Sequence, residues 1–207
     1  MMYILLIITF LFPFIIFWMP AKMKGQGVRA FLFRRFLIIF PYLLWLRLLD
    51  LKKGQWQTLQ ILFLFSMVVL LLFWERDEFK FKTSKMYANL SGPLNKTKYF
   101  ANIFNLLAFV LGEEAFFRLG ILSIIHSQVA VVLQALAFVG GHLLTPWGKS
   151  FQVKDLIRQL IFSLVVGIYF FETNNFILCV LAHLILNIPE LIHLFHRLNL
   201  KTFEDEV

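Results

Sequence analysis

Residues 106–118 read LLAFVLGEEAFFR, a run in which three ionisable side chains interrupt an otherwise apolar sequence. They are Glu113, Glu114 and Arg118, and one ionised group at the centre of a bilayer costs about 2.5–3.5 kcal/mol to insert. Glu114 and Arg118 are four residues apart, so they share a helix face and can form an internal ion pair. Glu113 points about 100° away from Glu114 on a helix, which leaves its carboxylate surplus and predicts that it faces a polar cavity.

The rest of the chain is equally apolar. Of its 207 residues, 60% are hydrophobic and 15% are charged, and the mean hydropathy is +0.78. Soluble domains have roughly 45–50% apolar and about 25% charged residues. A chain of this composition cannot cover a globule with polar surface. At about 20 apolar residues per span, it is expected to form an all-α, polytopic membrane helix bundle with about seven transmembrane spans and additional surface helices.

The seven predicted spans cover residues 1–19, 36–45, 56–74, 99–125, 129–144, 156–171 and 176–188. The second is the shortest and is flanked by Arg35 and Arg47, so its crossing requires snorkelling arginine side chains. The polar segment 75–98 is predicted to lie on the membrane surface. The tail after Pro189 has apolar residues at helical spacing and is predicted to form a short surface helix.

The net charge of +8 is best explained by topology. With the N-terminus outside, 16 of the 20 basic residues fall on the inner side, three fall on the outer side, and Arg118 lies within the membrane. The positive-inside rule therefore predicts a multi-pass protein of the cell membrane with a cytoplasmic C-terminus. The basic residues do not gather on one helix face, which argues against nucleic-acid binding. The single cysteine, Cys179, excludes an internal disulfide.

Two later spans also carry polar faces. His142 follows Phe138 by four residues, and Asn187 follows His183 by four residues, so each pair shares one helix face. Taken singly, His142 can be a hydrogen-bonded packing residue, and the other pair can be interhelical contacts worth about 0.6 kcal/mol on average. Together with Glu113, these faces supply a carboxylate, two imidazoles and an amide, which can activate water and stabilise an oxyanion.

This combination predicts specific roles. Glu113 would take a proton from water, while His183 and Asn187 would hold the carbonyl oxygen of a peptide bond. His142 would orient the water or protonate the leaving amine.

The motifs Glu-Glu-x-x-x-Arg, Phe-x-x-x-His and His-x-x-x-Asn resemble those of the CPBP family. That family comprises the CAAX prenyl endopeptidases and the bacteriocin-processing or bacteriocin self-immunity (Abi) proteins. The resemblance covers about residues 99–190 and implies an intramembrane endopeptidase. It implies a catalytic core at 99–190. The apolar and charged runs add N-terminal spans and a basic loop at 1–98 and a surface helix with a tail at 191–207, all in one membrane domain.

Carry-over of the family's motifs assigns each candidate position. The catalytic positions are Glu113 as the water-activating glutamate, His142 and His183 as the histidines, and Asn187 as the oxyanion-stabilising residue. The supporting positions are Glu114, Arg118 and Phe138.

The resemblance leaves the cofactor open between two alternatives. Glu113, His142 and His183 form an acceptable ligand set for a catalytic zinc ion, but the chain lacks an H-E-x-x-H motif. The sequence therefore favours an enzyme without a metal.

The implied partners are membrane lipid and a peptide or membrane-protein substrate, and no oligomeric state is predicted. The small size and the Phe/Ile/Leu/Lys-rich composition favour a bacterial member, which would have no prenylated CAAX substrate.

The chain departs from the family's pattern in two places. It stops before the eighth span of the larger members, and the turn before the last motif reads Glu-Thr-Asn-Asn at residues 172–175.

A non-catalytic immunity or scaffold protein that keeps the protease shell is one alternative function. A proton or ion pathway is another, because buried Glu and His also mark transporters, although paired interrupted helices are absent from the sequence.

The depths of the motifs lead to one further expectation. At 1.5 Å per residue, Glu113 lies about 22 Å along its span from Lys98, and His142 lies about 21 Å from Gln128 on a span that enters from the other side. Across a core of roughly 30 Å, these depths differ by several ångströms. The fourth span is therefore predicted to be long, or bent near Gly112.

Overall fold

The computed structural model describes residues 2–17, 33, 36–37, 39–45, 57–143 and 152–200. The regular elements within this part of the chain are all helices, which confirms the all-α class. Their bounds are α1 Met2–Phe17, α3 Thr58–Trp74, α4 Arg76–Lys82, α5 Lys85–Ser91, α6 Lys96–Glu114, the π-helix η2 Ala115–Leu122, α7 Ser123–Ile125, α8 Gln128–Leu143, α9 Val153–Thr173, α10 Phe176–Leu186 and α11 Ile188–Leu198. Residues 39–45 are also helical.

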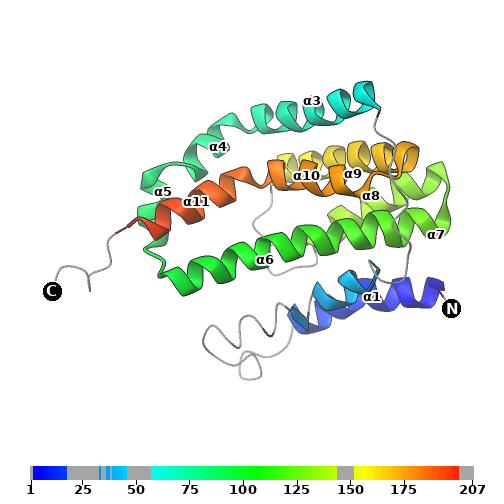
Figure 1. Cartoon of the computed structure of the whole chain (residues 1–207), viewed down its shortest axis with the longest axis horizontal. Helices are drawn as coiled ribbons and strands as arrows, with labels where there is room; N and C mark the ends of the chain where they lie inside the picture. Colours follow the sequence, from blue (N-terminus) through cyan, green and yellow to red (C-terminus); the bar gives the residue numbers. More distant parts are fainter. Residues whose placement is uncertain are drawn as a thin grey trace.

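The helices form a bundle around one long central rod (Figure 1). The rod consists of α6, η2 and α7 in succession, and its residues contact α8, α9, α10 and α11. Helix α3 lies along the opposite side of the bundle and contacts α9 and α10. Helix α1 lies beside the rod on the other side. This arrangement places the motif-bearing helices α6, α8 and α10 next to one another.

The helix predicted for the fourth span is long, as expected. The chain is helical from 96 to 125, which corresponds to about 45 Å at 1.5 Å per residue. The winding changes from α to π after Glu114. Every residue of η2 is buried, so the wider turn lies within the protein interior. The rod ends at His126, which adopts a left-handed conformation with φ 35°.

Aromatic packing attaches the N-terminal helices to this rod. The ring of Phe116 stacks on Tyr42 at a centroid distance of 5.0 Å and on Phe10 at 6.1 Å. Gly112 permits this approach, because a Cβ at that position would lie 3.3 Å from Tyr42 Cβ and 3.2 Å from Ile39 Cγ2. Each aromatic pair contributes about 0.5–1.5 kcal/mol beyond the area that it buries.

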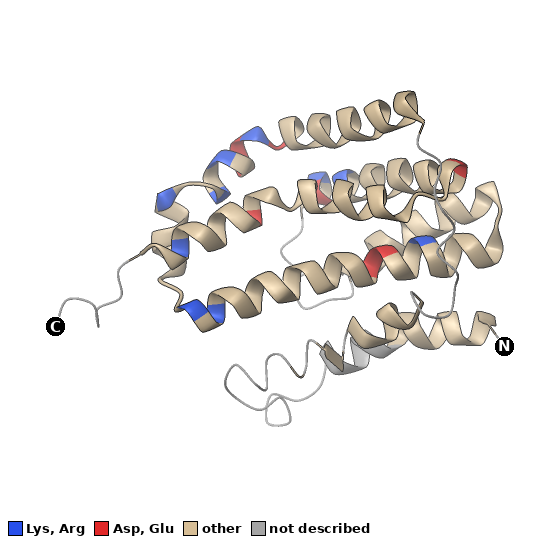
Figure 2. Cartoon of the chain, viewed as in Figure 1, with Lys and Arg blue, Asp and Glu red and all other residues tan. Residues whose placement is uncertain are grey.

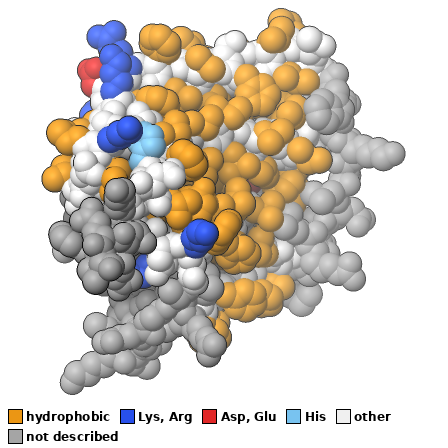
Figure 3. Space-filling view, turned by 60° about the vertical axis from the view of Figure 1, so that its left-hand side comes forward, with side chains coloured by type: hydrophobic (Ala, Val, Ile, Leu, Met, Phe, Trp, Pro, Cys, Tyr) orange, Lys and Arg blue, Asp and Glu red, His pale blue; other side chains and the backbone are white. Residues whose placement is uncertain are grey.

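The membrane character is visible in helix composition and in the surface. Helix α9 is long and apolar enough to cross a bilayer. Two pairs of successive helices also pass this test when taken together, but they are bent, α3–α4 by 75° and α10–α11 by 54°. If each bent pair is one span, the described residues contain three candidate spans. Met2–Leu11 and Gln128–Leu143 are shorter apolar helices. Large hydrophobic side chains such as Leu59 and Val129 are exposed, and Figure 3 shows a broad apolar face. These features agree with a membrane protein.

Charged residues are concentrated at one end of the bundle (Figure 2). Of those in the described part of the chain, most lie at the end of the bundle where α4, α5, α11 and the start of α6 meet, and the others lie in the middle of the central rod and on α9. The predicted surface segment 75–98 is helical over α4 and α5. Arg35 and Arg47, which flank the second predicted span, and the tail 201–207 lie outside the described residues.

The predicted helix after Pro189 is confirmed as α11. Its C-terminal turn is attached to the loop between α5 and α6, because Arg197 donates from Nε to the Gly92 carbonyl at 2.8 Å and from Nη2 to the Ser91 carbonyl at 2.9 Å. The backbone N–H of Leu94 donates in turn to the Arg197 carbonyl at 3.0 Å. These contacts hold the bent α10–α11 pair against the end of the bundle.

The turn at residues 172–175 joins α9 directly to α10. Asn174 ends α9 in the left-handed conformation, with φ 53°, a conformation that asparagine tolerates better than most residues. Asn175 caps α10 by accepting a hydrogen bond from the Leu178 N–H at 3.3 Å. This turn fixes where α10 begins and therefore how deep His183 lies.

Candidate active site

The buried ion pair expected from the i,i+4 spacing is present. Arg118 Nε donates to Glu114 Oε2 at 2.9 Å, and both side chains are completely buried. The pair spans the junction between α6 and η2. Because desolvation of two charges costs several kcal/mol per ion, such a pair requires further hydrogen bonds on its remaining polar atoms.

An amide on α8 supplies some of those bonds. Arg118 Nη1 donates to Gln134 Oε1 and lies 3.4 Å from Ser163 Oγ on α9. Gln134 Nε2 donates to the carbonyl of Ser163 at 2.9 Å and to that of Val131 at 3.0 Å. Neither Gln134 nor Ser163 was predicted from the sequence as a site residue. The available signal was the presence of an amide and a hydroxyl within two apolar spans.

His183 receives its orientation from Glu114. Its Nδ1 lies 2.9 Å from Glu114 Oε1, and a carboxylate oxygen can only accept, so the neutral imidazole donates its Nδ1–H there. The Nε2 atom then faces Glu113, with 3.8 Å to Glu113 Oε2. The ring packs against Phe162 and Phe138 at centroid distances of 5.0 and 6.0 Å. The imidazole is therefore held on three sides.

His142 approaches Glu113 from α8. Its Nδ1 lies 2.9 Å from the carbonyl oxygen of Phe138, which can only accept, so this nitrogen carries the proton in the neutral ring. Its Nε2 lies 3.9 Å from Glu113 Oε1. Glu113 thus has one histidine Nε2 near each carboxylate oxygen. Polar groups separated by more than 3.5 Å leave room for a bridging water molecule.

Asn187 lies at the bend between α10 and α11. Its Nδ2 donates to the His183 carbonyl at 3.0 Å. A carboxamide has two N–H donors, so a second donor remains for a substrate oxygen. The bend at this position leaves the amide at the end of α10, where it lines a pocket together with His183.

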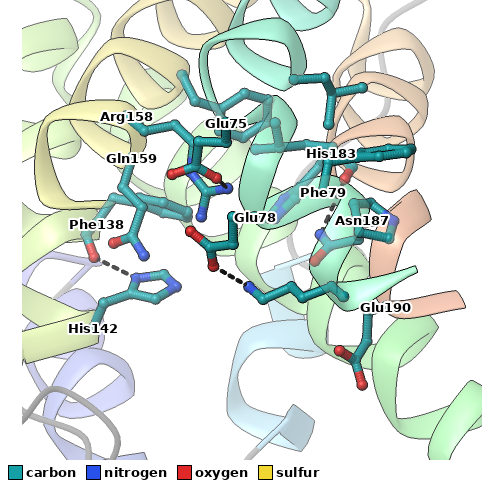
Figure 4. A pocket seen from close by; sticks show the side chains of 15 residues that line it. Glu75, Glu78, Phe79, Phe138, His142, Arg158, Gln159, His183, Asn187 and Glu190 are labelled. Carbon is teal, nitrogen blue, oxygen red and sulfur yellow. Dashed lines mark hydrogen bonds and ion pairs between the residues drawn. The ribbon is translucent and has the colours of Figure 1, made fainter. Parts of the chain in front are cut away.

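The pocket has a volume of about 180 Å³. Figure 4 shows His142 and Phe138 on one side of it and His183 and Asn187 on the other, with Glu75 and Glu78 also contributing side chains. At about 30 Å³ per water molecule, the pocket has space for several water molecules, and Glu113 is not among the residues that line it.

A protein-family model matches this part of the chain. The family is the type II CAAX prenyl endopeptidase Rce1-like family, and the match covers residues 95–189. Residues 95–189 are an Rce1-like domain. The resemblance inferred from the three motifs is thereby confirmed. No curated protein and no solved structure matches the chain.

The Rce1-like domain begins at Asn95, whose side chain caps α6 by accepting from the Lys98 N–H at 2.9 Å. It ends at Pro189, in the first turn of α11. It therefore includes helices α6 to α10 and all of the candidate site residues. The pocket extends beyond it, because α3 and α4 contribute Leu72, Glu75, Glu78, Phe79 and Lys82.

Within the described residues, three carboxylates approach one another closely enough to hold a metal ion: Glu75, Glu78 and Asp155. Two of them are already paired with cations. Arg158 donates to Glu75, and Lys82 Nζ lies 2.6 Å from Glu78 Oε1. This group is best described as an ion-pair network that joins α4 to α9, beside the Rce1-like site.

The environments of these two glutamates shift their pKa values in opposite directions. Burial raises the pKa of Glu75 above its usual value, and the nearby Arg158 charge opposes that effect. Burial also acts to raise the pKa of Glu78, but the hydrogen bond from Lys82 and the surrounding cations outweigh it, so the pKa lies below its usual value. Glu78 therefore holds its negative charge more readily than Glu75.

The alternative zinc set does not fit the observed geometry. In the described part of the chain, the possible ligand atoms of Glu113, His142 and His183, taken one from each residue, do not all lie within 4.8 Å of one another. Zinc bonds to nitrogen and oxygen of about 2.0–2.2 Å require closer ligands than that. The chemistry of the Rce1-like domain is accordingly derived from its own side chains.

Proposed function

We propose that the protein is an intramembrane endopeptidase that hydrolyses a peptide bond in a membrane-associated peptide or protein. The observation that supports this most strongly is the position of Glu113, whose two carboxylate oxygens lie 3.9 Å from His142 Nε2 and 3.8 Å from His183 Nε2. Family membership supports a peptide as the substrate.

In the proposed reaction, Glu113 removes a proton from water, and the water oxygen forms a bond to the scissile carbonyl carbon. The negative charge moves to the carbonyl oxygen. The second N–H of Asn187 stabilises that oxyanion, while Glu114 holds the neutral His183 imidazole with its Nε2 toward Glu113. The proton taken by Glu113 passes by way of His142 Nε2 to the leaving amine as the carbon–nitrogen bond breaks.

The membrane setting is the second part of the proposal. Seven spans would bring the central rod, α8 and α10 into the bilayer, with the N-terminus outside and the C-terminus in the cytoplasm of a bacterial cell. The exposed apolar faces of α1, α3 and α8 support contact with lipid. The substrate would then reach the pocket from within the membrane or from its cytoplasmic surface, where this topology would place α4.

Comparative membrane peptidomics tests this function. Strains that carry the wild-type protein, Glu113→Gln and the matched control Glu172→Gln would be compared, since Glu172 is exposed at the end of α9. Cleavage products present in the wild type and the control should disappear in Glu113→Gln, and their precursors should accumulate. Identical peptides in all three strains would contradict the proposal and would favour a non-catalytic immunity or scaffold protein.

A further inference from the structure

We propose that Gln134 is a positioning residue that sets the orientation of His183 through two intervening side chains. The contacts run from Gln134 to Arg118, from Arg118 to Glu114, and from Glu114 to His183. They connect α8, the central rod and α10. The catalytic consequence rests on the proposed function, whereas the contacts themselves do not.

The orientation of the Gln134 amide follows from its neighbours. Its Nε2 lies 2.9 Å from the Ser163 carbonyl and 3.0 Å from the Val131 carbonyl. Carbonyl oxygens can only accept, so the NH₂ group must face them and Oε1 must face Arg118. The Ser163 hydroxyl, 3.1 Å from Oε1, donates to the same oxygen. The amide therefore presents a fixed acceptor to the guanidinium.

That acceptor restricts the next two side chains. Arg118 uses Nη1 for Gln134 and Nε for Glu114 Oε2, so its planar guanidinium is held at two points. Glu114 uses its other oxygen, Oε1, for His183 Nδ1. Because each carboxylate oxygen has one partner, rotation of Arg118 would turn the carboxylate and release the imidazole.

Gly167 on α9 provides the space for this arrangement. A Cβ at position 167 would overlap Gln134 Nε2 and would lie 3.3 Å from both Gln134 Cδ and Val131 Cγ1. The first overlap is the tightest, so a methyl group there acts primarily on the Gln134 amide. The Gly167→Ala variant should therefore displace the Gln134 amide, although none of the hydrogen-bonding residues of the network is substituted.

Gln134 is completely buried and does not line the pocket. Its loss should therefore change the chemical step rather than the binding of the substrate. A displacement of about 1 Å in a catalytic group can lower the rate about 100-fold. We expect Gln134→Ala and Gly167→Ala each to lower kcat at least about tenfold, with KM changed less than about twofold.

A double-mutant cycle tests whether Gly167 acts through Gln134. In the Gln134→Ala background, Gly167→Ala should have little additional effect, because the group that it displaces is absent. The matched control is Gln60→Ala on α3, whose Oε1 is buried without a hydrogen-bond partner among the described residues. This control should keep wild-type kcat, and gel filtration and thermal melting would establish that all variants are folded.

A second readout does not depend on hydrolysis. ¹⁵N NMR of histidine-labelled protein in detergent reports which nitrogen of each neutral imidazole carries the proton. His183 should be protonated on Nδ1 in the wild type and in Gln60→Ala, and should become a mixture of tautomers in Gln134→Ala and Gly167→Ala. Folded variants with wild-type kcat and an unchanged His183 spectrum would overturn the inference. Absence of hydrolysis by the wild type would contradict the proposed function, while the NMR result would still decide the role of Gln134.

Discussion

His183 Nδ1 on α10 lies 2.9 Å from Glu114 Oε1 at the end of α6. This contact joins two motifs that are separated by 69 residues in the sequence. It also separates the tasks of two adjacent carboxylates. Glu114 is fully buried between Arg118 and His183, whereas Glu113 is partly exposed and faces Nε2 of both histidines. The buried residue orients the imidazole, and the partly exposed one is available for water.

Removal of one partner of the buried ion pair should be costly. Arg118→Leu leaves Glu114 as a buried carboxylate without its guanidinium, and we expect a loss of about 3–5 kcal/mol in unfolding free energy. The double variant Glu114→Gln/Arg118→Leu removes both charges and should recover part of that loss. Reversible denaturation in detergent measures both values. Equal stability of Arg118→Leu and the wild type would contradict the structural role of the pair.

Asn187→Ala tests the proposed oxyanion donor. Loss of one such donor typically lowers kcat about 10²–10³-fold, and we expect this range with the peptide identified by peptidomics. Asn199→Ala is the matched control, because Asn199 Nδ2 donates to the Phe195 carbonyl at 2.8 Å in the same i,i−4 geometry, but at an exposed position. Equally small effects of the two substitutions would show that Asn187 only caps its own helix.

The ion pair between Glu75 and Arg158 should stabilise the bend between α3 and α4. Glu75 is the residue between the two helices, and its side chain is buried against Arg158 of α9. A cycle with Glu75→Gln and Arg158→Gln should give a coupling free energy of about 0.5–3 kcal/mol.

The exposed pair Arg76–Asp77, with 3.8 Å between Nε and Oδ1, provides the comparison. Its coupling should be about 0–1 kcal/mol, as for other surface pairs. A Glu75–Arg158 coupling no larger than that of the surface pair would contradict a stabilising role at the bend.

Local periodicity accounts for much of what the sequence predicted. The helical class, the long fourth span, the helix after Pro189 and the pairing of Glu114 with Arg118 each follow from apolar runs or from i,i+4 spacing. These signals extend over at most a few helical turns, so a single sequence carries them. The family resemblance rested on three such short motifs.

Contacts between helices were not predictable in the same way. Gln134, Ser163 and Arg158 belong to spans whose rotation and depth depend on packing, so no spacing rule connects them to Arg118 or Glu75. The contact between Glu114 and His183 was missed for the same reason, although both residues were candidates. The π-helical winding of 115–122 was also unforeseen, because such turns form well under 1% of residues.

Chelation of metal ions should leave hydrolysis unchanged. Glu113, His142 and His183 are too widely spaced to share a zinc ion in the described geometry, so the proposed reaction uses side chains alone. Cleavage of the identified peptide would be followed before and after dialysis against EDTA and 1,10-phenanthroline. A loss of activity that added zinc restores would contradict this assignment.

The central claim is that Glu113 activates the water that cleaves a peptide bond. Its most direct test is cleavage of the identified peptide by purified protein in liposomes, with the wild type, Glu113→Gln and Glu172→Gln compared at equal folded concentration. A general base contributes about 10²–10⁴-fold to the rate, so Glu113→Gln should lose at least about 10²-fold in kcat while Glu172→Gln retains it. Cleavage by folded Glu113→Gln at the wild-type rate would contradict the claim.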